Sequence, residues 1–229
     1  ADSTYKLDVP TVAIFNSRLL EQHFEVNGYE FAKSYSFDPV LNDSLKEYLF
    51  AHEKDFKRKK QILIYGRPSV ERNALELIVA ALTEWASKQK NVEEWTVLSA
   101  GEDFGDIPVG EHTVIHSVGK LSLEEYAQTM LETSIGISLM VSPHPSYPPL
   151  EMSTFGVRTI TNCYGSKDLA SFNDNIVSIK NCSQTAICNK ILELCDTFSE
   201  EGSIGRNEQY LSEDVFDDIV KDLADYLRK

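Results

Sequence analysis

From Gln61 onward, short runs of β-branched and other apolar residues alternate with segments whose apolar residues have helical spacing. This alternation is typical of a parallel sheet, because two parallel strands must be joined by a crossover, which a helix usually supplies. The runs that predict strands cover residues 62–65, 96–99, 113–116, 135–140, 158–161 and 176–179. The sequence therefore predicts an α/β fold, a Rossmann-like parallel sheet with helices on both faces.

The helices between these strands are predicted from apolar spacing and from capping residues. Residues 70–87 repeat apolar side chains along one helix face. Ser122 and Glu125 form a capping box, which predicts that a helix begins there. Ser183 opens another helix, and residues 212–227, acidic at their start and apolar at helical spacing, predict a final one.

Residues 1–55 do not continue the alternation. They predict one strand over residues 11–15 and one helix over residues 17–24, which cannot bury a core by themselves. We expect this segment to be the closing strand and helix of a preceding domain, followed by a linker. Residues 56–205 then form the Rossmann-like domain, and residues 206–229 add a C-terminal helix that we expect to pack back on the preceding domain.

Charge and hydropathy exclude two classes of partner. The chain has 229 residues and a net charge of -14, so it lacks the basic surface that neutralises the phosphates of a nucleic acid. Its apolar runs are far shorter than the roughly 20 residues that cross a bilayer. The sequence does not open with a secretory signal. We therefore expect a soluble, cytoplasmic protein.

Several kinds of reactive site are not predicted. The four cysteines show neither a CxxC pair nor the spacing of zinc ligands, so we expect reduced thiols, no bound metal and no other cofactor. The sequence has no GxSxG elbow, no GxxxxGK[ST] loop and no GxGxxG fingerprint. These absences argue against hydrolase, NTPase and dinucleotide-binding functions.

A basic run, Lys57-Arg58-Lys59-Lys60, precedes the first strong strand. Charge runs are usually solvated, so we interpret this one as a solvated linker. The alternative is a peripheral contact with an anionic membrane surface, where each basic residue contributes about 1 kcal/mol. That alternative would place the protein at the inner face of the cell membrane.

Two strand ends carry a glycine, a cation and then the start of a helix, and ligands of open parallel sheets bind beyond these carboxyl ends. The two segments are Gly66-Arg67 and Gly119-Lys120. Gly66 allows a tight turn, and the guanidinium of Arg67 can hold a diphosphate through two hydrogen bonds. Taken singly, Arg67 could pair with a carboxylate and Lys120 could be a surface lysine, but the repetition favours a shared anion site. Arg72 is interpreted as a solvated helix residue, with phosphate binding as the alternative.

The segment SPHPSYPPLEMSTFG, residues 142–156, is unusually rich in proline, which fixes the backbone and suits a preformed pocket wall. Pro148 or Pro149 can occupy a first helical turn. Glu151 then lies near a helix start, either as a first-turn carboxylate or as the acceptor for two neighbouring sugar hydroxyls.

Three further residues of this proline-rich loop belong to the candidate site. Tyr147 either stacks on a base or covers the core. His144 either donates to a phosphate or sugar or is an ordinary loop histidine. Ser146 lies between them and is assigned to the same site.

Residues 61–162 resemble the C-terminal domain of retaining GT-B glycosyltransferases of the family 4 type. The resemblance runs through ILIYGRPSVERNALELIVAAL, VIHSVGKLSLEEYAQTM and SIGISLMVSPHPSYPPLEMSTFGVRTITN. The last two segments resemble the WsaF-type rhamnosyltransferases, which use dTDP-L-rhamnose. In that family an Arg and a Lys hold the diphosphate and match Arg67 and Lys120. A Tyr and a Glu engage the nucleoside and match Tyr147 and Glu151.

One position departs from the broader family. That family has two glutamates separated by seven residues, of which the first faces the donor sugar and the second the ribose. Glu151 matches the second, and this chain has Pro143 at the first. The rhamnosyltransferase branch shares the proline-rich replacement. The departure therefore restricts the choice of donor sugar more than it argues against catalysis. Arg72 stands where the broader family has a lysine.

The resemblance implies a glycosyltransferase that moves L-rhamnose, a deoxyhexose, from dTDP-L-rhamnose to a cell-surface polysaccharide or a lipid-linked glycan. It makes residues 56–205 the nucleotide-sugar-binding domain and residues 1–55 the end of the acceptor domain, so this chain alone is expected to be inactive. Arg67 and Lys120 are the expected catalytic residues. The expected donor site consists of Gly66, Arg67, Lys120, His144, Ser146, Tyr147 and Glu151. Alternatives are a nucleotide-sugar-binding module without transfer activity and a GT-B-fold epimerase.

Overall fold

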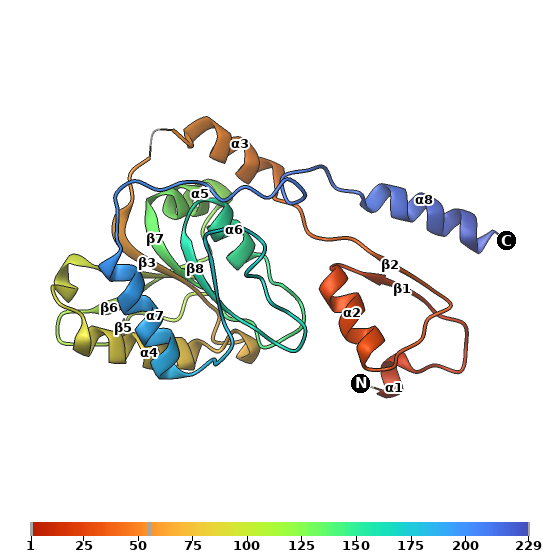
Figure 1. Cartoon of the computed structure of the whole chain (residues 1–229), viewed down its shortest axis with the longest axis horizontal. Coiled ribbons are helices and arrows are strands. Elements are labelled where there is room, and N and C mark those ends of the chain that lie inside the picture. The colour runs from red at the N-terminus through yellow and green to blue at the C-terminus, as the bar shows by residue number, and fades with distance from the viewer. Residues whose placement is uncertain (1, 55, 229) are drawn as a thin grey trace.

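The computed structural model describes residues 2–54 and 56–228, and its main body is built on one large sheet. Within those residues this sheet has seven strands in the order β5-β6-β4-β3-β7-β8-β9 (Figure 1). The strands are β3 (Lys59–Gly66), β4 (Thr96–Gly101), β5 (Ile107–Pro108), β6 (Val114–Gly119), β7 (Thr133–Ile137), β8 (Arg158–Asn162) and β9 (Ile176–Ile179). Neighbouring strands are parallel except for the short pair β5–β6. The predicted parallel sheet is confirmed.

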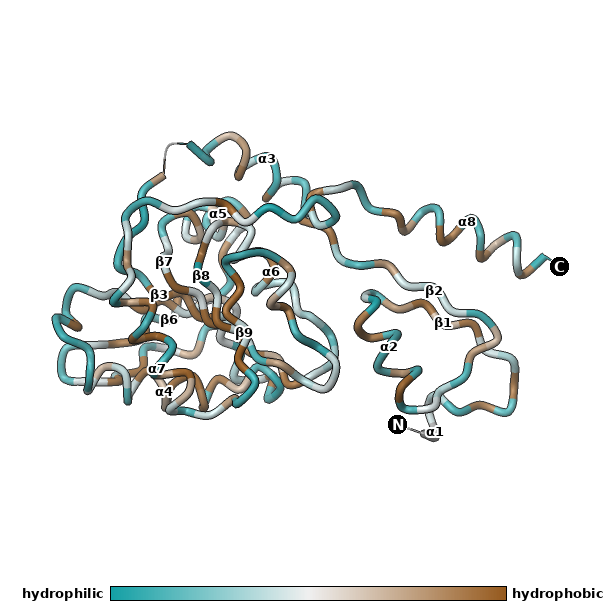
Figure 2. The backbone as a smooth tube through the Cα atoms, viewed as in Figure 1, coloured by the Kyte–Doolittle hydropathy of each residue, from teal (hydrophilic) through white to brown (hydrophobic). Residues whose placement is uncertain are grey.

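Helices cover both faces of this sheet, which confirms the predicted fold class. They are α3 (Asp43–His52), α4 (Leu75–Lys88), α5 (Leu123–Glu132), α6 (Pro148–Thr154) and α7 (Gln184–Asp196). Ile62 and Ile64 of β3 pack with α4 and α7, whereas Leu63 packs with α3, α5 and α6. Successive residues of a strand point to opposite faces, so one strand contributes to both cores. Figure 2 shows the strands of this sheet as hydrophobic stretches inside the main body.

Several predicted elements differ in their bounds from the observed ones, and two of these differences lie next to the proline-rich loop or the first long helix. The strand predicted over residues 135–140 ends at Ile137, because the backbone of Met140 bonds to the side chain of Asn162 instead of a neighbouring strand. The helix predicted over residues 70–87 begins only at Leu75. Ala74 has a left-handed φ of 50°, which separates this helix from a short 3-10 turn.

The two ends of the chain form a smaller unit beside the main body (Figure 1). Its elements are α1 (Asp2–Tyr5), β1 (Val12–Phe15), α2 (Arg18–Val26), β2 (Lys33–Ser36) and α8 (Phe216–Leu227). β1 and β2 pair in parallel. Asp222 of α8 accepts hydrogen bonds from Lys33 and from the hydroxyl of Tyr35, at 2.7 and 2.9 Å. The final predicted helix therefore exists and packs beside β2.

Neither β2 nor α3 is predicted from the sequence. α3 falls within residues 1–55, yet it buries Leu45 and Leu49 in the main body and packs on α5. The domain boundaries that we derived from the sequence stay predictions. Ala1, Asp55 and Lys229, which end the expected segments, lie outside the described residues.

The interpretation of the basic run as a solvated linker is wrong. Arg58 is only 4% exposed, because its guanidinium supplies donors to backbone carbonyls inside the main body. Lys59 and Lys60 belong to β3 and form ion pairs with Glu132 and Glu94. Lys57 is exposed, with its ammonium 3.9 Å from the carboxylate of Glu200. Among the described residues, no helix has the length and apolarity needed to cross a bilayer.

Candidate functional site

A cavity of about 610 Å³ lies at the carboxyl ends of β3, β4 and β6. It is the edge at which ligands of open parallel sheets bind. The cavity is lined by the loops that follow these strands, by the start of α5 and by the proline-rich loop. The predicted site residues in its lining are Arg67, Lys120, His144, Ser146, Tyr147 and Glu151.

Gly66 does not line the cavity, and its expected role in a tight turn is wrong. Its φ is not positive, and the reason for a glycine here is space. A Cβ at this position would collide with the hydroxyl of Ser99 and lie 3.3 Å from the side chain of Leu75. Gly66 therefore lets the end of β3 pack closely against Ser99 of β4 and Leu75 at the start of α4.

Cations line the cavity without forming an ion pair with any of the described residues. Among the described residues, Arg67, Arg72 and Lys120 form no ion pair and donate no side-chain hydrogen bond. Glu102 lies close enough to Arg67 for the cation to lower its pKa, but the larger cause of that shift is hydrogen bonding to Ser69. Positive charge without a partner at one cavity is what binding of an anion requires.

Arg72 is solvent-exposed as we expected, but it precedes α4 instead of belonging to it. It lies in the 3-10 turn Glu71–Asn73, is exposed and lines the cavity. Its carbonyl accepts a bond from the backbone N–H of Val141, at 2.8 Å, which joins this turn to the start of the proline-rich loop. The cavity therefore has a third cation.

Lys120 is placed by the turn between β6 and α5. Gly119 has a φ of 64°, which suits a glycine and redirects the chain at the strand end. The predicted capping box is confirmed: the N–H of Glu125 donates to the hydroxyl of Ser122 at 3.2 Å, and the N–H of Ser122 donates to Glu125 at 2.9 Å. These bonds fix the start of α5 and thereby the point from which Lys120 projects.

The proline-rich loop begins α6 as predicted, with prolines in its first turn. Glu151 lies half-buried one turn into α6 and faces the cavity. Burial raises the pKa of Glu151 to about 7, and the nearby phenol of Tyr126 opposes that rise. A carboxyl that has lost its water in this way gains from ligand donors such as sugar hydroxyls. Tyr147 is 43% exposed at the rim, so it does not cover the core.

His144 presents one ring nitrogen to the cavity. Its Nδ1 accepts the backbone N–H of Ser146 at 2.9 Å, and Ser146 adopts a positive φ of 70° to make this bond. Burial lowers the pKa of His144, and the cations Lys167 and Arg72 lower it further. The ring is therefore neutral at pH 7 with its proton on Nε2. That N–H is buried and has no hydrogen-bond partner among the described residues.

Two residues that support the loop were not found from the sequence. The side chain of Asn162 bonds to both the N–H and the carbonyl of Met140, at 2.7 and 3.1 Å. Lys167 is fully buried, donates to the same carbonyl at 2.6 Å, and has a pKa lowered by burial to about 8. Asn162 ends a predicted strand, which is a weak signal. Nothing in the sequence around Lys167 indicates its burial.

The site offers cations and hydrogen-bond donors rather than metal ligands. Within the described residues, no group of three or more His, Cys, Asp or Glu side chains could hold a metal ion. Cys163, Cys182, Cys188 and Cys195 are free thiols. The arrangement is suited to a ligand that carries negative charge next to hydroxyl groups.

Known proteins are similar to this chain in sequence. A family model described as "WsaF, C-terminal domain" matches residues 60–192. The chain is 32% identical over 164 residues to the O-antigen biosynthesis protein RfbC of Myxococcus xanthus. That similarity covers 71% of this chain but only 12% of the length of RfbC.

Solved structures share the fold. Sucrose-phosphate synthase from Thermosynechococcus elongatus has a TM-score of 0.59 at 15% identity, over 81% of this chain and 49% of the other. A glycosyltransferase from Rickettsia africae has a TM-score of 0.56 at 14% identity, over 82% and 53%. TarM has a TM-score of 0.60 at 12% identity, over 81% and 36%. These likenesses show the layered α/β fold of GT-B glycosyltransferases.

Proposed function

This chain belongs to the family of WsaF C-terminal domains, and we propose that it is the donor-binding half of a glycosyltransferase of polysaccharide biosynthesis. The observation that carries the proposal is the cavity at the carboxyl edge of the sheet. It combines the unpaired cations Arg67 and Lys120 with the half-buried carboxyl of Glu151. A nucleoside diphosphate sugar supplies the matching groups, a diphosphate for the cations and hydroxyls for the carboxyl.

We propose dTDP-L-rhamnose as the donor. The support is the proline-rich loop, which resembles that of dTDP-rhamnose users and carries Pro143 where the broader family has a glutamate. The acceptor is proposed to be a cell-surface polysaccharide or a lipid-linked glycan, because RfbC is described as a protein of O-antigen biosynthesis. Such an acceptor would bring the protein to the inner face of the membrane. The similarity covers only 12% of RfbC, so the identity of the acceptor is part of the proposal.

In the proposed transfer, the bond between the anomeric carbon and the diphosphate oxygen breaks, and its electron pair stays on the diphosphate. Arg67 and Lys120 stabilise that growing negative charge, which is usually the largest contribution to such catalysis. Tyr147 and Glu151 orient the nucleoside, and the Nε2–H of His144 donates to an oxygen of the donor. The acceptor hydroxyl forms the new bond to the anomeric carbon, and its proton passes to the departing diphosphate. Retention of the anomeric configuration is part of the proposal. The cations make a bound metal unnecessary.

Calorimetric titration with dTDP, UDP, GDP and ADP tests this proposal. We expect dTDP to bind more tightly than GDP or ADP. Comparison of dTDP with UDP also examines Glu151, because deoxyribose offers one hydroxyl where ribose offers two neighbouring ones. Binding of none of these diphosphates would overturn the donor-site proposal. Equal affinity for all of them would leave a nucleotide site but remove the case for dTDP.

A second candidate is a binding module without transfer activity. The observation in its favour is that the candidate residues gathered at the cavity all fit the donor side of the reaction. A transfer assay with dTDP-L-rhamnose and a rhamnan acceptor, on this chain and on a longer protein that contains it, separates the two. Transfer by the longer protein alone supports the glycosyltransferase, whereas binding without transfer by both supports the module.

A further inference from the structure

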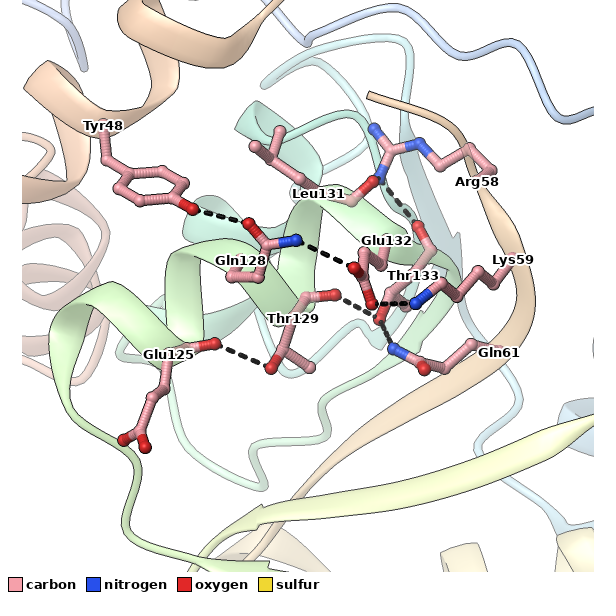
Figure 3. A network of polar contacts seen from close by, with 10 residues as sticks. All are labelled: Tyr48, Arg58, Lys59, Gln61, Glu125, Gln128, Thr129, Leu131, Glu132 and Thr133. Atoms are coloured by element: carbon pink, nitrogen blue, oxygen red, sulfur yellow. Dashed lines mark hydrogen bonds and ion pairs between the residues drawn. The ribbon is translucent and has the colours of Figure 1, made fainter. Parts of the chain in front are cut away.

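Arg58, which immediately precedes β3, is held by the backbone of two helices. Its Nη1 donates to the carbonyls of Met130, Leu131 and Thr133 at 2.7, 2.9 and 2.7 Å, and its Nη2 donates to the carbonyl of Phe155. Figure 3 shows the guanidinium beside Leu131 and Thr133 at the end of α5. One side chain therefore connects the end of α5, the residue after α6 and the start of β3.

These carbonyls lie at or next to helix ends, and the carbonyl of Met130 also accepts the backbone N–H of Thr133. The last carbonyls of a helix have no partner within it, and a cation there also interacts favourably with the helix dipole. Met130 and Leu131 are in the last turn of α5, and Phe155 is the residue that caps α6. Arg58 thus donates hydrogen bonds to backbone carbonyls of both helices, at the ends that point away from the cavity.

The opposite ends of the same three elements carry the candidate site. Arg67 follows β3 directly, and Lys120 lies just before α5. Tyr147 immediately precedes α6, and Glu151 is in its first turns. The distances between the cations, the tyrosine and the carboxyl therefore depend on how β3, α5 and α6 stand relative to one another.

Two glycines and an aromatic ring lie close to the side chain of Arg58. A Cβ at Gly202 would lie 2.7 Å from Nε of Arg58, and a Cβ at Gly156 would collide with Nη2. The ring of Phe56 lies 4.4 Å from the Cζ atom. Burial lowers the pKa of Arg58 to about 10, so the side chain stays charged at neutral pH. Arg58 also borders a cavity of about 540 Å³, so its position is set by these contacts and by its hydrogen bonds and not by close packing on every side.

A chain of hydrogen bonds continues from Arg58 along α5 (Figure 3). Gln61 donates to the hydroxyl of Thr133 at 2.7 Å, and that hydroxyl donates to the carbonyl of Thr129 at 2.7 Å. The hydroxyl of Thr129 donates to the carbonyl of Glu125 at 2.7 Å, and Glu125 caps the helix at Ser122. α5 is therefore supported from the Arg58 end to the turn that carries Lys120.

We propose that Arg58 is a positioning residue for the cavity: by tying α5 and α6 to the start of β3, it sets the separation of Lys120 from Tyr147 and Glu151. The effect on ligand affinity rests on the proposed function, whereas the effect on helix placement does not. A purely local structural role would lower stability without changing the far ends of the two helices.

Arg58→Met tests the proposal, with Arg158→Met as the matched control. Arg158 is exposed near the same amino edge of the sheet and forms no ion pair or side-chain hydrogen bond among the described residues. We measure dTDP affinity well below the unfolding temperature and amide exchange of residues 120–125 and 147–151 without ligand. For Arg58→Met we expect at least about tenfold weaker dTDP binding, the scale of a small misplacement of binding groups, and faster exchange in both segments. Arg158→Met should match the wild type.

Gly202→Ala keeps the arginine but displaces it, so it answers the same question if Arg58→Met does not fold. Its Cβ must push Nε aside, and its backbone is not strained because its φ is not positive. Unchanged exchange in residues 120–125 and 147–151, in Gly202→Ala and in any folded Arg58→Met, would overturn the positioning role. If the wild type binds no diphosphate, the proposed function fails, but the exchange measurement still decides the role of Arg58.

Discussion

An arginine flanks β3 on each side, and the two side chains meet opposite environments. Arg58, at the amino edge of the sheet, is 4% exposed and donates to the carbonyls of two helix ends. Arg67, at the carboxyl edge, is half-buried and has no side-chain partner among the described residues. A cation whose donors are already used supports the fold, and a cation whose donors are free is available to a ligand. The difference lies in the partners, because residue type and strand are the same.

The largest expected effect is the loss of stability when Arg58 is replaced. Arg58→Met leaves several buried carbonyls without a donor, so we expect the free energy of unfolding to fall by about 3 kcal/mol or more. Arg67→Met removes no internal bond and should change it by less than about 0.5 kcal/mol. Urea denaturation of both variants measures the two values. Similar losses of unfolding free energy in the two variants would show that Arg58 supports the fold no more than Arg67 does.

The next largest effect is on binding at the carboxyl edge. Arg67→Ala and Lys120→Ala should each weaken dTDP by about 1–3 kcal/mol, the scale of a hydrogen bond to a charged group. Thymidine, which lacks the diphosphate, should bind with unchanged affinity, and thermal midpoints should stay near that of the wild type. Wild-type dTDP affinity in both variants would identify Arg67 and Lys120 as surface cations.

Glu151 extends the comparison from the two arginines to an acidic side chain, which forms no ion pair among the described residues. Its pKa is raised by burial from 4.5 to about 7, so the folded state prefers the protonated form. Its contribution to stability is therefore greatest below pH 4.5 and is lost as the pH rises towards 7. Glu151→Gln should raise the free energy of unfolding at pH 8 by about 1–2 kcal/mol and leave it nearly unchanged at pH 4.5. Denaturation at both pH values, with dTDP titration at pH 8, separates the roles. Unchanged dTDP affinity at pH 8, whatever the change in stability, would remove Glu151 from the site.

The smallest effect is expected at His144, whose free donor is neutral. His144→Phe should weaken dTDP-L-rhamnose by about 0.5–1.5 kcal/mol, the value of an uncharged hydrogen bond, and His144→Gln should recover part of it. Because its pKa is lowered, the ring should not titrate between pH 7 and 8. Nitrogen-15 NMR of the imidazole reads the tautomer directly. A proton on Nδ1 at pH 7 would contradict the assigned donor.

The sequence predicts most of the sheet because its strands are local patterns. The β-branched run at residues 62–65 and the capping box at Ser122 report on neighbours in the chain, and both are confirmed. The shared location of Arg67 and Lys120 follows from topology, since parallel strands end at the same edge. That the cavity gathers them is seen in the structure, while their roles stay predictions.

The buried cations could not be predicted because their partners are distant in sequence. Arg58 bonds to carbonyls 72 to 97 residues away, and the carbonyl that holds Lys167 is 27 residues away. Backbone carbonyls carry no sequence signature, so a basic run that supplies donors to them looks the same as a solvated one. β2 and α3 were missed for a related reason, because they depend on packing with remote segments.

The half-buried carboxyl of Glu151 couples ligand binding to proton exchange with the solvent. With a pKa of about 7, about half of these carboxyls carry a proton at pH 7. Sugar hydroxyls that donate to the carboxylate favour the ionised form, so binding releases part of a proton into the buffer. The diphosphate of dTDP-L-rhamnose has no proton that titrates near pH 7, so the observed heat of its binding should differ between Tris and phosphate, whose ionisation enthalpies are different. The affinity at a fixed pH should stay the same. In Glu151→Gln that buffer dependence should disappear.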